Sequence, residues 1–311
     1  MRNPSGPVVC VSYVALAELW TVPRFPRVNY GTPISSIEWS IAADGPMTAA
    51  ALVAMGAPVR LLANDIGGDE HGRFVRRWLA QRDVIPVTTR PDATTPRIVV
   101  AADDAHTRTW FAHLPHVVSG LEQIDLTPVT AASFLYVDSY EIIEGAVLRA
   151  IAAARRAEIP ILLNLGGSPL AAPTAAAIAG YPHLLVQTNV DDSDYLEAVA
   201  VATALLERTS AKWAVVTAGA FGAVAVSRSK ELAVPSFPVN VRHTHCAGRP
   251  SQPGCSTVCE KGGRCCTASD WDAPVGRCDV HDTTAHHCRA SRSCWRSSTQ
   301  PNHPHRKMPS R

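Results

Sequence analysis

The sequence predicts an α/β protein with a central, mostly parallel sheet flanked by helices. From Phe134 onward, segments with strand and helix patterns alternate along the chain. The predicted strands are continuous apolar runs, which are typical of parallel strands buried on both faces. The chain has 311 residues, 46% hydrophobic and 18% charged, so it can form a large core and is not a disordered protein.

In the N-terminal half, one helix has a clear amphipathic pattern. Apolar residues at 70–83 recur on one helical face, and arginines occupy the other. Residues 18–43 contain three prolines and then an alternation of apolar and polar residues, which predicts a strand-rich insertion over one sheet edge. In order, we expect a strand at 8–16, helix 46–55, strand 59–64, helix 70–83, and a hairpin of strands 97–102 and 108–111.

In the C-terminal half, we expect strands at 134–138, 161–165, 184–187, 213–217, 223–227 and 232–235, with helices at 144–157, 171–180 and 191–209. Ligands of open α/β sheets bind beyond the carboxyl ends of the strands. Functional residues are therefore expected in the loops 165–168, 188–194, 217–222 and 243–248.

The composition changes near residue 243. Eight of the nine cysteines lie between Cys246 and Cys294, and no Leu, Ile, Phe or Tyr occurs after Phe237. We therefore divide the chain into residues 1–254 and a Cys/His/Arg-rich tail at 255–311. Three explanations of the tail stay open: a frameshifted or corrupted C-terminus, a metal module, and a disordered basic segment.

Charge and hydropathy exclude several functional classes. The net charge of +2 predicts no general attraction to nucleic acid. No uninterrupted apolar run approaches the ~18 residues that a membrane helix needs. The N-terminus lacks the basic flank and cleavage site of a signal peptide, so we expect a cytoplasmic protein.

Three spaced motifs identify a resemblance. The first is a strand followed by Gly67-Gly68-Asp69-x-x-Gly72 at the start of a helix. The second is Asn189-x-x-Asp192 after a strand, and the third is Val216-Thr217-x-Gly219-x-x-Gly222. In this order they resemble the ribokinase-like (PfkB) carbohydrate kinase family over about residues 8–254. The resemblance implies a three-layer α/β fold with a small β-lid, here at about residues 18–43.

The resemblance implies ATP-dependent transfer of a phosphoryl group to a hydroxyl of a sugar or nucleoside, with ATP and Mg²⁺ as cofactors. The family's D-T-x-G-A-G-D motif corresponds to residues 243–249, so Ala247 and Gly248 would form the anion hole. Arg249 stands where the family has its catalytic Asp. A guanidinium stays protonated, so Arg249 is not expected to act as the base.

The remaining site residues also follow from the resemblance. Asn189, Thr217, Gly219 and Gly222 would bind the nucleotide, and Asp192 would hold Mg²⁺ through water. Asp44 and Thr48 are candidates for substrate hydroxyls, with an ordinary cap or turn as the alternative.

Two residues of the predicted hairpin, Arg108 and His113, would reach a substrate only if the hairpin lies beside the lid.

Two functions therefore stay open. The first is an ATP-dependent carbohydrate kinase acting on a small sugar or nucleoside. The second, favoured by Arg249, is a catalytically inactive nucleotide- or sugar-binding protein. Neither nucleic acid nor a membrane is an expected partner, and the resemblance allows a lid-to-lid homodimer.

Overall fold

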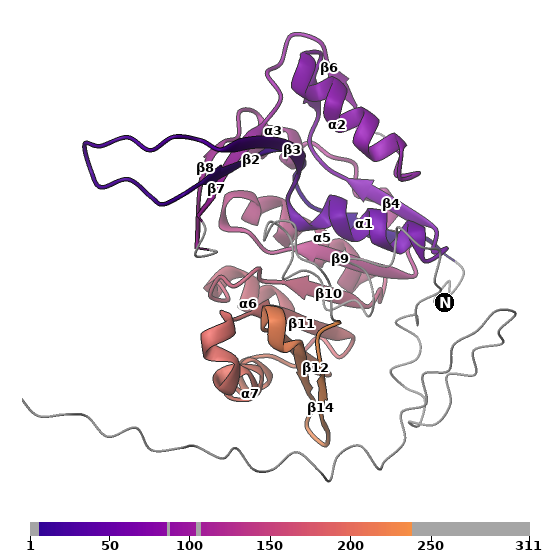
Figure 1. The fold of residues 1–311 in the computed structure, drawn as a ribbon. Coiled ribbons are helices and arrows are strands. Elements are labelled where there is room, and N and C mark those ends of the chain that lie inside the picture. The colour runs from indigo at the N-terminus through magenta and orange to yellow at the C-terminus, as the bar shows by residue number, and fades with distance from the viewer. Residues whose placement is uncertain (1–5, 86–87, 104–106, 238–311) are drawn as a thin grey trace, which may run out of the picture. The chain divides into compact units, whose positions relative to one another are not determined.

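An eight-stranded sheet forms the centre of the fold (Figure 1). We describe a computed structural model over residues 6–85, 88–103 and 107–237. The strand order is β14-β13-β12-β11-β10-β9-β1-β4. Neighbouring strands from β4 to β12 are parallel, and β13 and β14 are antiparallel additions, so the predicted mostly parallel sheet is confirmed. The bounds are β1 Val8–Val11, β4 Val59–Leu62, β9 Phe134–Asp138, β10 Ile161–Asn164, β11 Leu184–Asn189, β12 Trp213–Thr217, β13 Ala223–Val226 and β14 Glu231–Val234.

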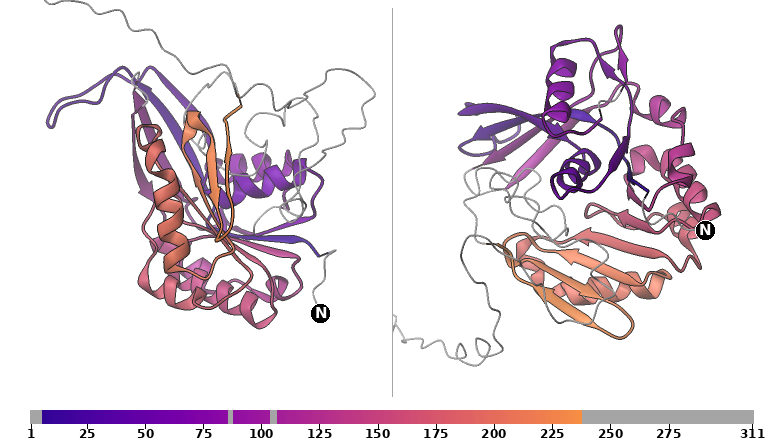
Figure 2. Two further views of the ribbon diagram at one scale, coloured as in Figure 1. Left: turned by 90° about the horizontal axis from the view of Figure 1, so that it is seen from below. Right: turned by 90° about the vertical axis from the view of Figure 1, so that its right-hand side faces the viewer.

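Helices cover both faces of this sheet (Figure 2). On one face, Cys10 and Tyr136 pack in one core cluster with residues of α1 (Asp44–Ala54). On the other face, Val9 and Leu135 pack with α5 (Glu144–Arg156), α6 (Ala172–Ile178) and α7 (Ala198–Arg208). Because successive strand residues point to opposite faces, this division confirms the three-layer arrangement.

The lid is a second sheet of four strands, ordered β3-β2-β7-β8. Its strands are β2 (Ala15–Val22), β3 (Ser36–Ala42), β7 (Arg97–Asp103) and β8 (Arg108–His113). The insertion expected at 18–43 supplies β2 and β3, and the predicted hairpin supplies β7 and β8. Because β2 pairs in parallel with β7, the hairpin lies beside the insertion. This is the arrangement in which Arg108 and His113 were expected to be able to reach a substrate.

The strand predicted at 8–16 is wrong as a single element. Between β1 and β2 the chain leaves the central sheet at Ser12–Val14 and joins the lid. The side chain of Asn64 stabilises this break: its Oδ1 accepts the Val14 N–H at 2.9 Å, and its Nδ2 donates to the Val14 carbonyl at 3.1 Å. A distant side chain thus takes hydrogen bonds that a continuous strand would make.

The first motif has a structural role at the start of α2 (Glu70–Ala80). Asp69 is the N-cap and accepts the Gly72 N–H at 2.8 Å. It also accepts the Thr95 hydroxyl at 2.5 Å and the Thr95 N–H at 2.9 Å. Partial burial alone would raise the pKa of Asp69, but these hydrogen bonds outweigh it and lower the pKa. Asp69 therefore joins α2 to the segment that enters the lid.

Several short elements complete the described chain. The strands β5 (Ile66–Gly67) and β6 (Thr89–Arg90) and the helices α3 (Val117–Glu122), α4 (Thr127–Thr130) and η1 (Glu141–Ile143) were not predicted. The helix expected at 191–209 begins as the 3₁₀ segment η2 (Asp192–Glu197). Within residues 6–85, 88–103 and 107–237, no helix has the length and hydropathy needed to cross a bilayer. The domain boundary predicted at 254 and the tail lie outside the described residues.

Candidate functional site

Asp138 joins three chain segments at the carboxyl end of the central sheet. Its Oδ2 accepts the Ser12 hydroxyl at 2.5 Å and the Gly45 N–H at 2.8 Å. Its Oδ1 accepts the Tyr136 hydroxyl at 2.7 Å and the Asn164 amide at 2.8 Å. The carboxyl group therefore fixes the end of β1, the start of α1 and the end of β10 relative to one another.

Burial governs the ionisation of this cluster. It raises the pKa of Asp138, and the hydrogen bonds from Ser12, Asn164, Tyr136 and Gly45 only partly oppose it. Burial and the neighbouring Asp138 likewise raise the pKa of Tyr136 well above its usual value. Because both carboxylate oxygens of Asp138 already accept two hydrogen bonds each from the protein, we assign it a positioning role under the site rather than contact with a ligand.

Asp44 lies at the start of α1, next to this cluster. Its Oδ2 accepts the Tyr140 hydroxyl at 2.5 Å and the Asn164 amide at 2.8 Å. Ala43, the N-cap residue, has φ 73° and ψ 159°, a backbone conformation that strongly favours glycine. Gly45 permits the close approach of α1 to β1, because a Cβ there would lie 2.3 Å from the Cβ of Ser12. The backbone around Asp44 is thus tightly constrained.

Thr48 lies one turn further along α1 and is buried. Its side chain hydrogen-bonds to Tyr136. The structure therefore brings the two residues expected to contact the substrate into one network through Asn164 and Tyr136. Their contact with a substrate stays a prediction.

The residues expected to bind the nucleotide gather at the ends of β11 and β12. Asn189 and Thr217 are paired across these strands, and the Val190 N–H donates to the Thr217 carbonyl at 2.9 Å. Asp192 is exposed and accepts the Ala220 N–H at 3.3 Å. The second and third motifs, which lie about thirty residues apart in the sequence, therefore form one local surface.

Two glycines shape this surface. Gly219 has φ 39°, and a Cβ there would lie 2.0 Å from Oδ1 of Asp192, so the loop backbone runs directly against that carboxylate. Gly222 has φ 94°, and a Cβ there would lie 2.1 Å from the carbonyl oxygen of Val234. The exposed carboxylate of Asp192 has oxygen lone pairs available for metal-bound water, which fits the chemistry of Mg²⁺.

The positions predicted for the anion hole and the base, Ala247, Gly248 and Arg249, lie outside the described residues. Their roles stay predictions from the sequence.

Sequence reasoning missed the polar residues that surround Asp44 and the end of β9. Asp138 and Asn164 end two adjacent apolar strands, and Tyr140 follows the first of them. Polar side chains at the carboxyl ends of buried parallel strands are the signal that could have found them.

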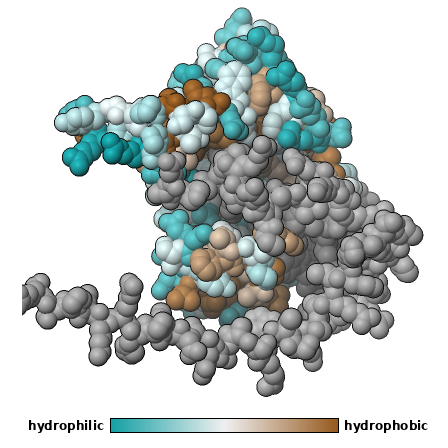
Figure 3. Space-filling view, in the orientation of Figure 1, coloured by the Kyte–Doolittle hydropathy of each residue, from teal (hydrophilic) through white to brown (hydrophobic). Residues whose placement is uncertain are grey.

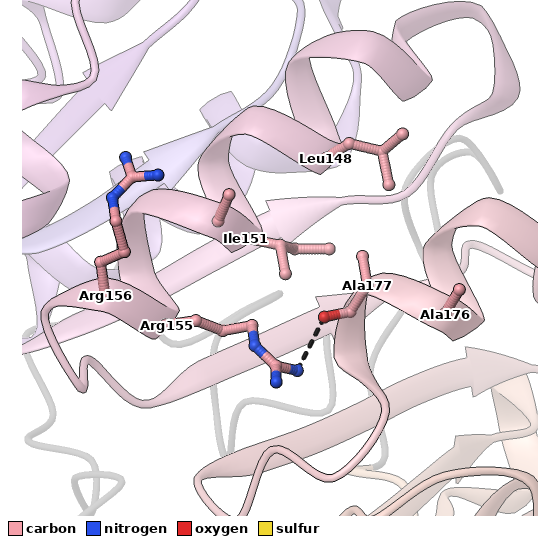
Figure 4. Close-up of a pocket in the computed structure, with 7 residues that line it drawn as sticks. Leu148, Ile151, Arg155, Arg156, Ala176 and Ala177 are labelled. Carbon is pink, nitrogen blue, oxygen red and sulfur yellow. Dashed lines mark hydrogen bonds between the residues drawn. The ribbon is translucent and has the colours of Figure 1, made fainter.

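A separate groove lies between α5 and α6 (Figure 4). Its lining residues are Leu148, Ile151, Ala152, Arg155, Arg156, Ala176 and Ala177. Arg155 donates to the Ala177 carbonyl at 2.8 Å and the Ala179 carbonyl at 2.9 Å, so it caps the end of α6. Because α5 ends just before β10 begins, these arginines lie at the amino edge of the sheet, opposite the candidate site.

Comparisons with known proteins agree with the architecture. The sequence profile described as pfkB family carbohydrate kinase matches residues 45–248. No curated protein sequence is significantly similar to the chain.

Solved structures show the same fold. Thermotoga maritima ribokinase is 14% identical, with 75% of this chain and 78% of that chain covered and a TM-score of 0.59. Arabidopsis thaliana ribokinase, solved with ribose and ATP, is 17% identical, with 75% and 79% covered and a TM-score of 0.58. A Methanocaldococcus jannaschii nucleoside kinase is 17% identical, with 77% and 79% covered and a TM-score of 0.60.

Proposed function

The chain belongs to the pfkB family of carbohydrate kinases, and we propose that it binds MgATP and a small sugar or nucleoside for phosphoryl transfer to a hydroxyl group. The observation that supports this most is the placement of two polar clusters at the carboxyl end of one sheet. The first surrounds Asp44, and the second contains Asn189 and Asp192. In α/β sheets of this kind, ligands bind at that edge.

Each cluster has a defined part in this proposal. Bound MgATP would supply the transferable γ-phosphoryl group. Asn189, Thr217 and the loop from Gly219 to Gly222 would hold the nucleotide, and Asp192 would hold Mg²⁺ through water. Asp44 would accept a hydrogen bond from a substrate hydroxyl, kept in position by Tyr140 and Asn164. Phosphoryl transfer depends mainly on such positioning and charge neutralisation.

Arg249 determines how fast the transfer can be. A protonated guanidinium cannot accept the proton of the attacking hydroxyl, and loss of general-base catalysis typically costs ~10²–10⁴ in rate. Arg249 thus favours the second candidate function, a protein that binds nucleotide and sugar without efficient transfer.

The experiment is a transfer assay on the full chain with radiolabelled ATP, Mg²⁺, and D-ribose, D-fructose or adenosine. Asp44→Asn serves as the control for the acceptor side. Transfer that Asp44→Asn reduces supports the kinase. Calorimetric binding of MgATP and an acceptor without transfer supports the binding protein, and binding of neither contradicts both.

Two further expectations accompany this proposal. We expect the protein to act in the cytoplasm. We also expect a homodimer formed through the lid, on which the exposed apolar residues include Ile37, Trp110 and Phe111 (Figure 3). Analytical ultracentrifugation of the chain and an Ile37→Lys variant tests the dimer, which the added charge should weaken.

A further inference from the structure

Gln187 continues a row of polar residues across the sheet. Asp138 on β9 is paired with Asn164 on β10, and Asn164 is paired with Gln187 on β11. Paired residues of parallel strands point to the same face of the sheet. The Asn164 amide reaches Asp44 at 2.8 Å on that face, so Gln187 points to the side of the sheet where Asp44 lies.

The amide of Gln187 has an unsatisfied buried atom. Gln187 is 4% exposed, and its Oε1 has no hydrogen-bond partner among the described residues. A buried polar atom without a partner is unfavourable in folding, and native proteins contain few of them. Such an atom at a candidate site calls for an explanation.

The strand neighbours do not supply the missing partner. The Asn164 amide already donates to Asp44, Tyr136 and Asp138, and its Oδ1 accepts the Gly166 N–H at 3.1 Å. On the other side, Gln187 is paired with Val215, whose side chain is apolar.

We propose that Gln187 contacts the phosphoryl acceptor, and that its Oε1 accepts a hydrogen bond from a neutral hydroxyl or amino group of that substrate. This inference rests on the proposed kinase or binding function. Asp44 and Gln187 then both present acceptor oxygens, which pair with hydroxyl and amino donors. The part of the acceptor that meets these two residues therefore carries neutral hydroxyl or amino groups, as in a polyol or nucleoside.

The test is calorimetric binding of D-ribose, D-fructose and adenosine to the full chain and to Gln187→Leu, with and without MgATP. We expect Gln187→Leu to bind these probes about 3- to 30-fold more weakly, because one hydrogen bond to the substrate is lost. Its melting temperature without ligand should be equal to or above that of the wild type, since the variant removes an unsatisfied polar atom. Gln81→Leu, an exposed change just after α2, is the matched control and should bind like the wild type.

The outcomes separate this inference from the proposed function. If the wild type binds a probe and Gln187→Leu binds it equally well, the role of Gln187 is refuted and the proposed function stands. If the wild type binds no nucleotide and no acceptor, both proposals fail. Should Gln187→Leu not fold, Gln187→Met removes the amide from an unbranched side chain, and the same comparisons apply.

Discussion

Replacement of Gly222 by alanine tests the geometry of the loop that we assign to the nucleotide. At φ 94° an alanine is strained, by an amount of order 1–3 kcal/mol. Its Cβ would also lie 2.1 Å from the carbonyl oxygen of Val234, so the backbone of β14 must move. Inserting atoms into a packed site typically costs a further ~1–3 kcal/mol. We expect Gly222→Ala to lower the free energy of unfolding by about 2–6 kcal/mol in total.

Gly180→Ala provides the matched control. Gly180 has φ 68°, and a Cβ there would meet no atom within 4 Å. Both variants therefore have an alanine at a positive φ and the same gain in stability from a less flexible unfolded chain. Their difference reports the contact with Val234, which we place at about 1–3 kcal/mol, together with the extra backbone strain of an alanine at ψ −134°.

Urea-induced unfolding, followed by tryptophan fluorescence, measures both free energies. Calorimetric titration with MgATP should show weaker binding by Gly222→Ala and unchanged binding by Gly180→Ala. If the two variants unfold at the same urea concentration and bind MgATP equally well, the described loop geometry and its role are both refuted.

Two other predictions concern stability. Ala43→Gly should raise the free energy of unfolding by about 1 kcal/mol, because glycine relieves the backbone strain at φ 73° at some entropic cost. The control, Ala50→Gly inside α1, should lower the free energy of unfolding by a similar amount. A lower urea midpoint for Ala43→Gly than for the wild type would contradict this prediction. Asp69→Asn should remove a pH-dependent contribution to the free energy of unfolding. The folded pKa of Asp69 is lowered, so the wild type's advantage is present above the ordinary value of 3.8 and is lost as the pH falls through the lowered pKa. Urea midpoints from about pH 6 to pH 2 measure this loss, and a constant difference would refute it.

The order of strands and helices was predictable because apolar runs and helical spacing are local signals. The strand at 134–138 and the helix at 144–157 agree with β9 and α5 to within one residue. The break at Ser12–Val14 was not predictable, because it depends on hydrogen bonds from Asn64, some fifty residues away. The parallel pairing of β2 with β7 likewise follows from three-dimensional packing and not from either segment alone.

The site was predictable in part. Motif spacing located Asn189, Asp192 and Gly222, which the structure brings to one edge of the sheet. Asp138 and Gln187 were not singled out, because their importance arises from burial and from the partners that surround them or are lacking. Such properties depend on neighbours from several strands, which no local pattern specifies.

The most direct test of the account is the rate of phosphoryl transfer from MgATP to D-ribose, D-fructose or adenosine by the chain and by Arg249→Asp. The account predicts that the aspartate restores a proton acceptor and accelerates transfer by about 10²–10⁴. Transfer by the unchanged chain at a rate equal to or above that of Arg249→Asp would contradict it, because Arg249 would then not limit the reaction.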